Sequence, residues 1–425
     1  MIASLGRSVK DYGKHVVAFR PNARLYLTFA IITGIAIGIY RLIFNFYLLS
    51  LGYDARLMGY LTTTTSLTAL FFALPMGYMA DILGRKTSLL ISAGMMSLSI
   101  GLMVIWPVPS VFYAMNVLGG IAQSLAAVTM SPFLMENSSE YERTYLFSFG
   151  QGIQMVAASV GNWIGGYLPT WVANARGVDA LSSQAYGGSI LVVSIALAIG
   201  IIPLILIKMP RLGHSERTVF APISYAAKYP VKLTKLILPM LITSIGAGLI
   251  MPFMNVFFRE QYGQSDPVIG VLMAWGSLAM GIGLLVAPPL ADRMGKIQLV
   301  VITQGLSIPF LILLGFSPLF WLSAFAYYIR VALMNMSSPV YQTFVMEKVD
   351  ASSRAMVASL VSMAWNFGWV ISPMISGSLQ VKYGFGPPFL GTIILYTISV
   401  FLYWYFWWHK GEASPPAVAE APPEQ

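Results

Sequence analysis

The sequence predicts an all-α, polytopic membrane protein with twelve transmembrane helices in two pseudo-symmetric six-helix bundles. Hydrophobic residues make up 57% of the 425 residues and charged residues only 10%, whereas a soluble globular protein carries about 25% charged residues. Apolar runs of about 20 residues, the length that crosses a hydrocarbon core about 30 Å thick, recur along the chain. An internal repeat relates the two halves. The predicted spans are 25–51, 57–80, 88–106, 109–135, 144–168, 187–208, 234–258, 267–290, 297–315, 318–346, 355–378 and 387–408.

Several classes of protein are excluded by residues that the chain lacks. Cysteine is absent, which excludes disulfides, thiolate zinc sites and cysteine nucleophiles. The three histidines, His15, His214 and His409, lie outside the apolar runs, which argues against a histidine proton relay. No catalytic or metal-binding constellation stands out, so we expect no enzyme, no cofactor and no metal site. The net charge of +9 would favour nucleic acid in a soluble protein, but here it indicates topology.

Basic residues are distributed unequally between the two sides of the predicted membrane. Most lie in the N-terminal segment, the middle loop and every second connection, and only Arg56, Arg176, Arg259 and Lys382 fall on the other side. The positive-inside rule therefore places both termini and the middle loop in the cytoplasm, below a cell (inner) membrane. The predicted segments are a cytoplasmic N-terminal segment 1–24, bundles 25–208 and 234–408, a cytoplasmic linker 209–233 and a disordered cytoplasmic tail 409–425.

One offset of 211 residues superimposes the two halves without a gap. Two bundles related by duplication are typical of secondary transporters, with a binding site near the bilayer midplane. The positions matched by this offset are Gly52 and Gly263, Gly59 and Gly270, Asp81 and Asp292, Gly84 and Gly295, Arg85 and Lys296, Glu136 and Glu347, Arg143 and Arg354, and Ser148 and Ser359.

The loop between the second and third spans carries a recognisable motif. Its residues Gly77-Tyr-Met-Ala-Asp81-Ile-Leu-Gly84-Arg85-Lys86 resemble the Gly-x-x-x-Asp-x-x-Gly-Arg-Lys signature of the major facilitator superfamily. The resemblance covers 25–408 and implies a monomeric secondary transporter that works by alternating access, binds a small molecule in the lipid bilayer and couples to a co- or counter-transported ion. The counterpart in the second half is Pro288-Pro-Leu-Ala-Asp292-Arg293-Met-Gly295-Lys296, with proline in place of the glycine.

The chemistry of this motif predicts a gate. Gly77 would let another helix approach closely, Asp81 could face the positive end of a helix, and Gly84 permits a tight turn. Arg85 could form a forked ion pair with Glu136. In the family such networks close the cytoplasmic side of the outward-facing state, although ordinary solvated loop charges would look the same in sequence. The predicted gating residues are Gly77, Asp81, Gly84, Arg85, Glu136, Arg143, Asp292, Lys296, Glu347 and Arg354.

Only two ionisable side chains, Arg41 and Arg330, fall well within the apolar spans. An arginine at the centre of a membrane helix costs about 2.5–3.5 kcal/mol, which usually marks function. In the family the first, fourth, seventh and tenth helices line the cavity, so both arginines are expected to face it and to bind an anion. Alternatively each arginine caps carbonyls, and each amide joins helices. The predicted substrate-binding residues are Arg41, Asn45, Asn116, Gln123, Gln154, Asn255, Tyr327, Arg330, Trp365 and Asn366.

Two further functions remain open besides transport of a small organic anion. The segment Gly161-Asn162-Trp-Ile-Gly165-Gly166 resembles the core of the antiporter motif of drug exporters, with asparagine where proline is expected. Together with the 24 methionines, which adapt to varied ligands, it favours export of drug-like or lipid-like amphipaths. A non-transporting sensor or scaffold with the same fold is the third possibility.

Overall fold

The computed structural model describes residues 21–136, 140–208, 229–349 and 354–409. These residues form helices, with no strand among them, and confirm the predicted fold of two six-helix halves. The predicted 1–24 segment, the linker and the tail lie largely outside the described residues.

The N-terminal half consists of α2 (Pro21–Ser50), α3 (Ala55–Leu83), α4 (Arg85–Ile105), α5 (Pro109–Glu136), α6 (Glu140–Arg176) and α7 (Ser183–Leu206). The C-terminal half consists of α9 (Pro230–Ile250), η1 (Met251–Phe253), α10 (Met254–Tyr262), α11 (Asp266–Met294), α12 (Lys296–Phe316), α13 (Phe320–Glu347), α14 (Arg354–Tyr383), α15 (Gly386–Tyr403) and η3 (Trp404–Trp408).

Two spans differ from their predictions. The helix predicted over 144–168 runs from Glu140 to Arg176 and continues through Pro169. The span predicted over 234–258 is interrupted at η1, because Pro252 has no N–H to donate to the preceding turn. In the described part of the chain, nine segments are long and apolar enough to cross a membrane. The segments α6, α13 and α14 complete the set of twelve.

Glycines with positive φ end corresponding helices in the two halves. Gly84 and Gly295 have φ values of 81° and 92° and each separates two helices without any other connecting residue. Gly52 and Gly263, with φ values of 84° and 60°, occupy the matching turns at the other end of the helices. A residue with a Cβ atom would be strained at these positions. We call the end with Gly84 and Gly295 the basic end, and the end with Gly52 and Gly263 the opposite end.

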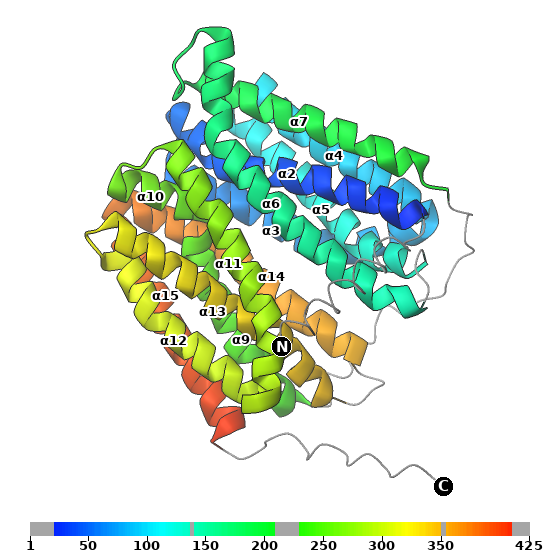
Figure 1. Cartoon of the computed structure of the whole chain (residues 1–425), viewed down its shortest axis with the longest axis vertical. Coiled ribbons are helices and arrows are strands. Elements are labelled where there is room, and N and C mark those ends of the chain that lie inside the picture. The colour runs from blue at the N-terminus through cyan, green and yellow to red at the C-terminus, as the bar shows by residue number, and fades with distance from the viewer. Residues whose placement is uncertain (1–20, 137–139, 209–228, 350–353, 410–425) are drawn as a thin grey trace, which may run out of the picture.

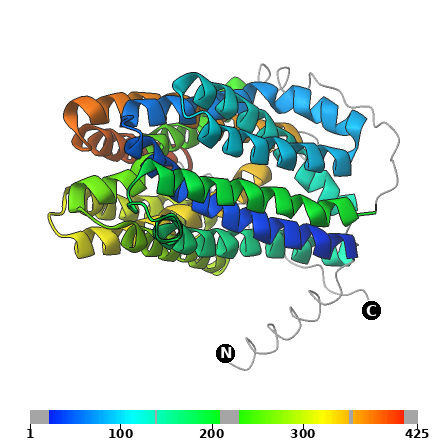
Figure 2. The same ribbon diagram turned by 90° about the horizontal axis from the view of Figure 1, so that it is seen from above.

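The two halves converge at the opposite end and separate toward the basic end (Figure 1). Seen from above, the helices of both halves run side by side along a common direction (Figure 2). The halves meet where α3 packs on α14 and where α6 packs on α11. At the second contact, a Cβ atom on Gly270 would lie 2.7 Å from the Asn162 carbonyl oxygen. At the first, a Cβ atom on Gly59 would collide with the Pro373 backbone.

The basic end is open in this structure. A Cβ atom added to Gly77 would meet no atom of the described residues within 4 Å, so the close approach predicted at Gly77 is not seen in this state. Nearby on α3, the side chains of Phe71, Leu74 and Tyr78 are about 70% exposed. The contacts that close the molecule therefore lie at the opposite end, and glycines other than Gly77 provide them.

Candidate functional site

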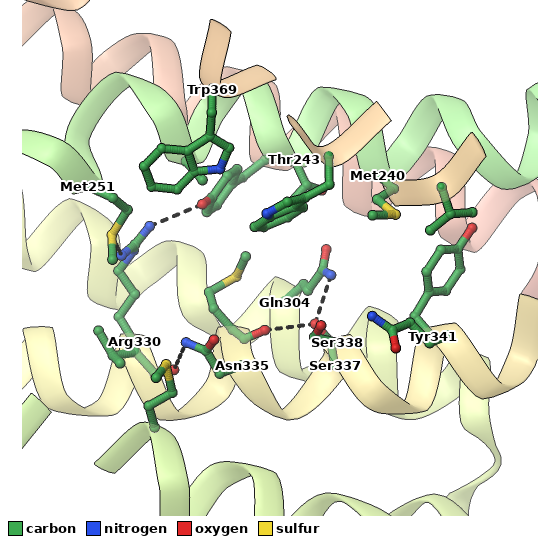
Figure 3. A pocket seen from close by; sticks show the side chains of 18 of the residues that line it. Met240, Thr243, Met251, Gln304, Arg330, Asn335, Ser337, Ser338, Tyr341 and Trp369 are labelled. Carbon is green, nitrogen blue, oxygen red and sulfur yellow. Dashed lines mark hydrogen bonds between the residues drawn. The ribbon is translucent and has the colours of Figure 1, made fainter. Parts of the chain in front are cut away.

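A cavity of about 600 Å³ lies within the C-terminal half, where α9, η1, α11, α12, α13, α14 and α15 contribute to its lining (Figure 3). The resemblance implied a cavity lined by the first, fourth, seventh and tenth helices, which belong to both halves, but this cavity draws its lining from the C-terminal half alone. Its lining includes Met240, Thr243, Met251, Ser277, Met280, Gln304, Tyr327, Arg330, Met334, Asn335, Ser337, Ser338, Tyr341, Met346, Trp365, Trp369, Tyr396 and Tyr403.

Arg330 is the charged residue of this lining. It projects from α13 toward Met251 and Trp369 (Figure 3), and its side chain is only 2% exposed. Its Nη1 donates to the Met251 thioether at 3.3 Å, and its Nη2 donates to the Tyr396 hydroxyl at 3.2 Å. Its Nε has no hydrogen-bond partner. The guanidinium is therefore buried among neutral groups, with no carboxylate among its described partners.

Much of the rest of the lining is apolar or hydrogen-bonded to neighbouring protein groups. Tyr327 is buried beside Gly276 and contacts the Met273 thioether through its hydroxyl at 3.4 Å. Gln304 donates to the Ser337 hydroxyl at 3.0 Å. Methionine contributes five of the lining residues. The cavity thus combines one cation with flexible apolar walls.

Arg41 does not line this cavity. It is an exposed residue on α2, one helical turn from Asn45 on the same face. The described cavity therefore holds Arg330 without Arg41, and a shared site for the two arginines between the halves stays a prediction.

Asn45 and Asn255 also lie outside this cavity, because they bond to each other across the two halves. The Asn45 amide donates to the Pro252 carbonyl at 2.8 Å and to Asn255 Oδ1 at 3.0 Å. In return the Asn255 amide donates to the Leu42 carbonyl at 2.7 Å. The broken helix at η1 makes the Pro252 carbonyl available to the other half. These asparagines join the halves near the opposite end.

The remaining predicted binding residues divide into three groups. Asn116 is buried inside the N-terminal half, where it accepts from the Thr65 hydroxyl at 2.7 Å and donates to the Phe112 carbonyl at 2.8 Å. It therefore joins α3 to α5 and is not available to a ligand. Trp365 lines the cavity. The side chains of Gln123, Gln154 and Asn366 are exposed and do not line it.

Two ion pairs are described among the predicted gating residues at the basic end, each within one half. Asp81 binds Arg85, the first residue of α4 and one turn further along the chain, at 2.7 Å. Lys296 forms an ion pair with Glu347, as the repeat predicted. Asp292 is exposed. The side chains of Glu136, Arg143 and Arg354 lie outside the described residues.

Sequence reasoning missed a polar cluster at the opposite end. Arg259 appears in the sequence only as one of four basic residues on the outer side, but it forms an ion pair with Asp266 and donates to the Tyr186 hydroxyl at 2.8 Å. Asp266 is buried at the start of α11. No signal in the sequence linked these residues, because they come from three helices and have no counterparts in the repeat.

Comparison with known proteins agrees with this architecture. The family model described as Major Facilitator Superfamily matches residues 26–243 and 236–424. The chain is 26% identical over 355 residues to the multidrug resistance protein MdtG of Dickeya zeae (strain Ech586), covering 80% of this chain and 82% of that protein.

Solved structures of transporters have the same fold. A nucleoside transporter, NupG, has a TM-score of 0.72 at 15% identity, over 91% of this chain and 98% of NupG. A bacterial homologue of the human lysosomal transporter Spinster, inward-facing and occupied, has a TM-score of 0.74 at 13% identity, over 94% of this chain and all of that one. A D-xylose–proton symporter has a TM-score of 0.69 at 16% identity, over 90% and 97%. The chain therefore belongs to the major facilitator superfamily, a family of multi-pass membrane transporters.

Proposed function

We propose that this secondary transporter carries an amphipathic organic compound with one negatively charged group, and that Arg330 binds that group. The observation that carries the proposal is the buried Arg330 guanidinium, whose described partners are all neutral. Burying an unpaired charge is costly. A bound anion would neutralise this charge within the cavity.

The present partners of Arg330 can give way to such an anion. The thioether of Met251 is a weak acceptor, and methionine is flexible enough to move aside. A carboxylate or phosphate would accept two parallel N–H bonds from the guanidinium, which is roughly twice as strong as a neutral arrangement. The vacant Nε hydrogen is a further donor close by.

The walls of the cavity suit an apolar substrate body. Met240, Met280, Met334 and Met346 line it together with Trp365. Methionine-rich surfaces adapt to ligands of different shape. The similarity to a protein named for multidrug resistance supports export of drug-like amphipaths as the direction of transport, and the antiporter-like segment at Gly161 is consistent with it.

We also propose that the basic end faces the cytoplasm of an inner membrane, in accordance with the positive-inside rule. The structure is then open to the cytoplasm. When that end closes, the charges of Asp81, Arg85, Lys296 and Glu347 would form contacts between the halves, which is the gating role expected from the motif.

The test compares binding of one amphipathic carboxylate and its neutral methyl ester to the purified protein, followed by quenching of tryptophan fluorescence. Losing the charged hydrogen bonds of Arg330 in Arg330→Gln should weaken binding of the carboxylate by roughly 10- to 100-fold and leave the ester unaffected. Arg330→Lys should bind the carboxylate with an affinity between those of the wild type and Arg330→Gln, because an ammonium cannot donate two parallel N–H bonds to it.

Arg41→Gln is the matched control, since Arg41 is the other arginine within a span and does not line the cavity. It should bind the carboxylate as the wild type does. Equal binding of carboxylate and ester by the wild type would contradict the proposal, and so would an equal loss in the two glutamine variants.

A further inference from the structure

Three polar side chains meet in the contact between the halves at the opposite end. The Tyr186 hydroxyl, from α7 of the N-terminal half, donates to Asp266 Oδ2 at 2.5 Å. Arg259 at the end of α10 donates to the same hydroxyl at 2.8 Å and forms an ion pair with Asp266 Oδ1. Tyr186 is 1% exposed and Asp266 6%. Water is therefore largely excluded from these bonds.

Arg259 has a second contact with the N-terminal half. Its guanidinium carbon lies 3.4 Å from the centre of the Phe46 ring on α2. Phe46 and Tyr186 lie close together, with ring centres 6.3 Å apart. The ion pair of the C-terminal half is thus held between two aromatic side chains of the N-terminal half.

We infer that Tyr186, Arg259 and Asp266 form an opposite-end latch that sets how often this end of the transporter opens. A carrier that works by alternating access must separate its halves at this end to reach the second compartment. Opening would remove Tyr186 and Phe46 from the ion pair, because both belong to the other half. This role does not depend on which solute is carried.

The placement of the charges makes the latch releasable. Arg259 and Asp266 belong to the same half, so their ion pair persists when the halves part and no buried charge is left alone. Splitting a buried ion pair between the halves would disfavour opening by more than roughly a hundredfold. Loss of the tyrosine hydrogen bond to a charged group corresponds to roughly tenfold or somewhat more. The latch therefore favours the closed opposite end without locking it.

The absence of cysteine allows a direct measurement on the full-length protein in lipid nanodiscs. Spin labels on cysteines at Leu181 and Leu319, which are 64% and 62% exposed at the opposite end of the two halves, report the separation by double electron–electron resonance. Tyr186→Phe removes the hydroxyl and keeps the ring. It should raise the ratio of long to short distances roughly tenfold.

Tyr262→Phe is the control, because the Tyr262 hydroxyl donates to the Ser317 carbonyl within the C-terminal half. It should leave the distances as in the wild type. Asp266→Asn, alone and combined with Tyr186→Phe, completes a double-mutant cycle in which the two effects should be non-additive. The inference is overturned if Tyr186→Phe gives the same distances as Tyr262→Phe. If Asp266→Asn does not fold, the comparison of Tyr186→Phe with Tyr262→Phe still tests the inference.

Discussion

The two ends of the molecule use their charged and polar residues differently. At the opposite end, Arg259 and Asp266 of one half bond to Tyr186 of the other, and Asn45 bonds to Asn255 across the same contact. At the basic end, the described ion pairs, Asp81 with Arg85 and Lys296 with Glu347, stay within one half. Contacts between the halves therefore distinguish the closed end from the open one.

The same difference appears along a single helix. Gly59 and Gly77 both lie on α3, one toward each end. Gly59 is covered by the backbone of Pro373 and Met374 in the other half, whereas Gly77 has open space around it. Gly59 has a repeat partner, Gly270, which also lies in a close contact between the halves. In this state the halves therefore pack closely at Gly59, which has a repeat partner, and not at Gly77 of the motif.

The largest effect is expected for Gly59→Val. The new side chain would collide with the Pro373 backbone, and a backbone cannot move aside as a flexible side chain can. Overpacking of this kind costs about 1–3 kcal/mol or more, so the closed opposite end should become roughly 10- to 100-fold less populated. The distance between labels at Leu181 and Leu319 measures this change.

Gly77→Val serves as the matched control on the same helix. Since no atom lies within 4 Å of its added Cβ, the distances at the opposite end should not move toward separation. If both variants separated the opposite end equally, the distinction between the two glycines would be lost.

A smaller effect is expected for Asn45→Ala. It removes two hydrogen bonds between the halves, to Pro252 and Asn255. Hydrogen bonds between membrane helices average only about 0.6 kcal/mol, so the ratio of open to closed opposite ends should rise by roughly sevenfold for the pair. Asn116→Ala is the control, because Asn116 bonds within the N-terminal half. It should lower the melting temperature without separating the ends.

Sequence reasoning predicts those features of the fold that are local or repeated. Apolar length predicts the spans, and glycines at a constant offset predict the positive-φ turns at Gly84 and Gly295. The pairing of Lys296 with Glu347 follows from the same offset. Apolar length, the conformational freedom of glycine and the attraction of opposite charges within one half do not change when the halves move relative to each other.

The site was predicted less well, because polarity alone does not say which partner a residue has. Of the predicted binding residues, Arg330, Tyr327 and Trp365 line the cavity of the C-terminal half, which is not the cavity between the halves that was predicted. Asn45, Asn255 and Asn116 are polar for another reason, since each bonds to a neighbouring helix. The opposite-end latch depends on where three helices end in space, and no spacing in one sequence reveals it.

The smallest effect is expected at the basic end, for Lys296→Gln. The side chains of Lys296 and Glu347 are 26% and 45% exposed, and exposed ion pairs contribute about 0–1 kcal/mol. Both residues also belong to the same half, so breaking the pair does not favour the open opposite end. The fraction of long distances between labels at Leu181 and Leu319 should not rise above that of the wild type. A shift as large as that of Asn45→Ala would mean that the basic end also stabilises this state, and the two ends could no longer be treated as separate.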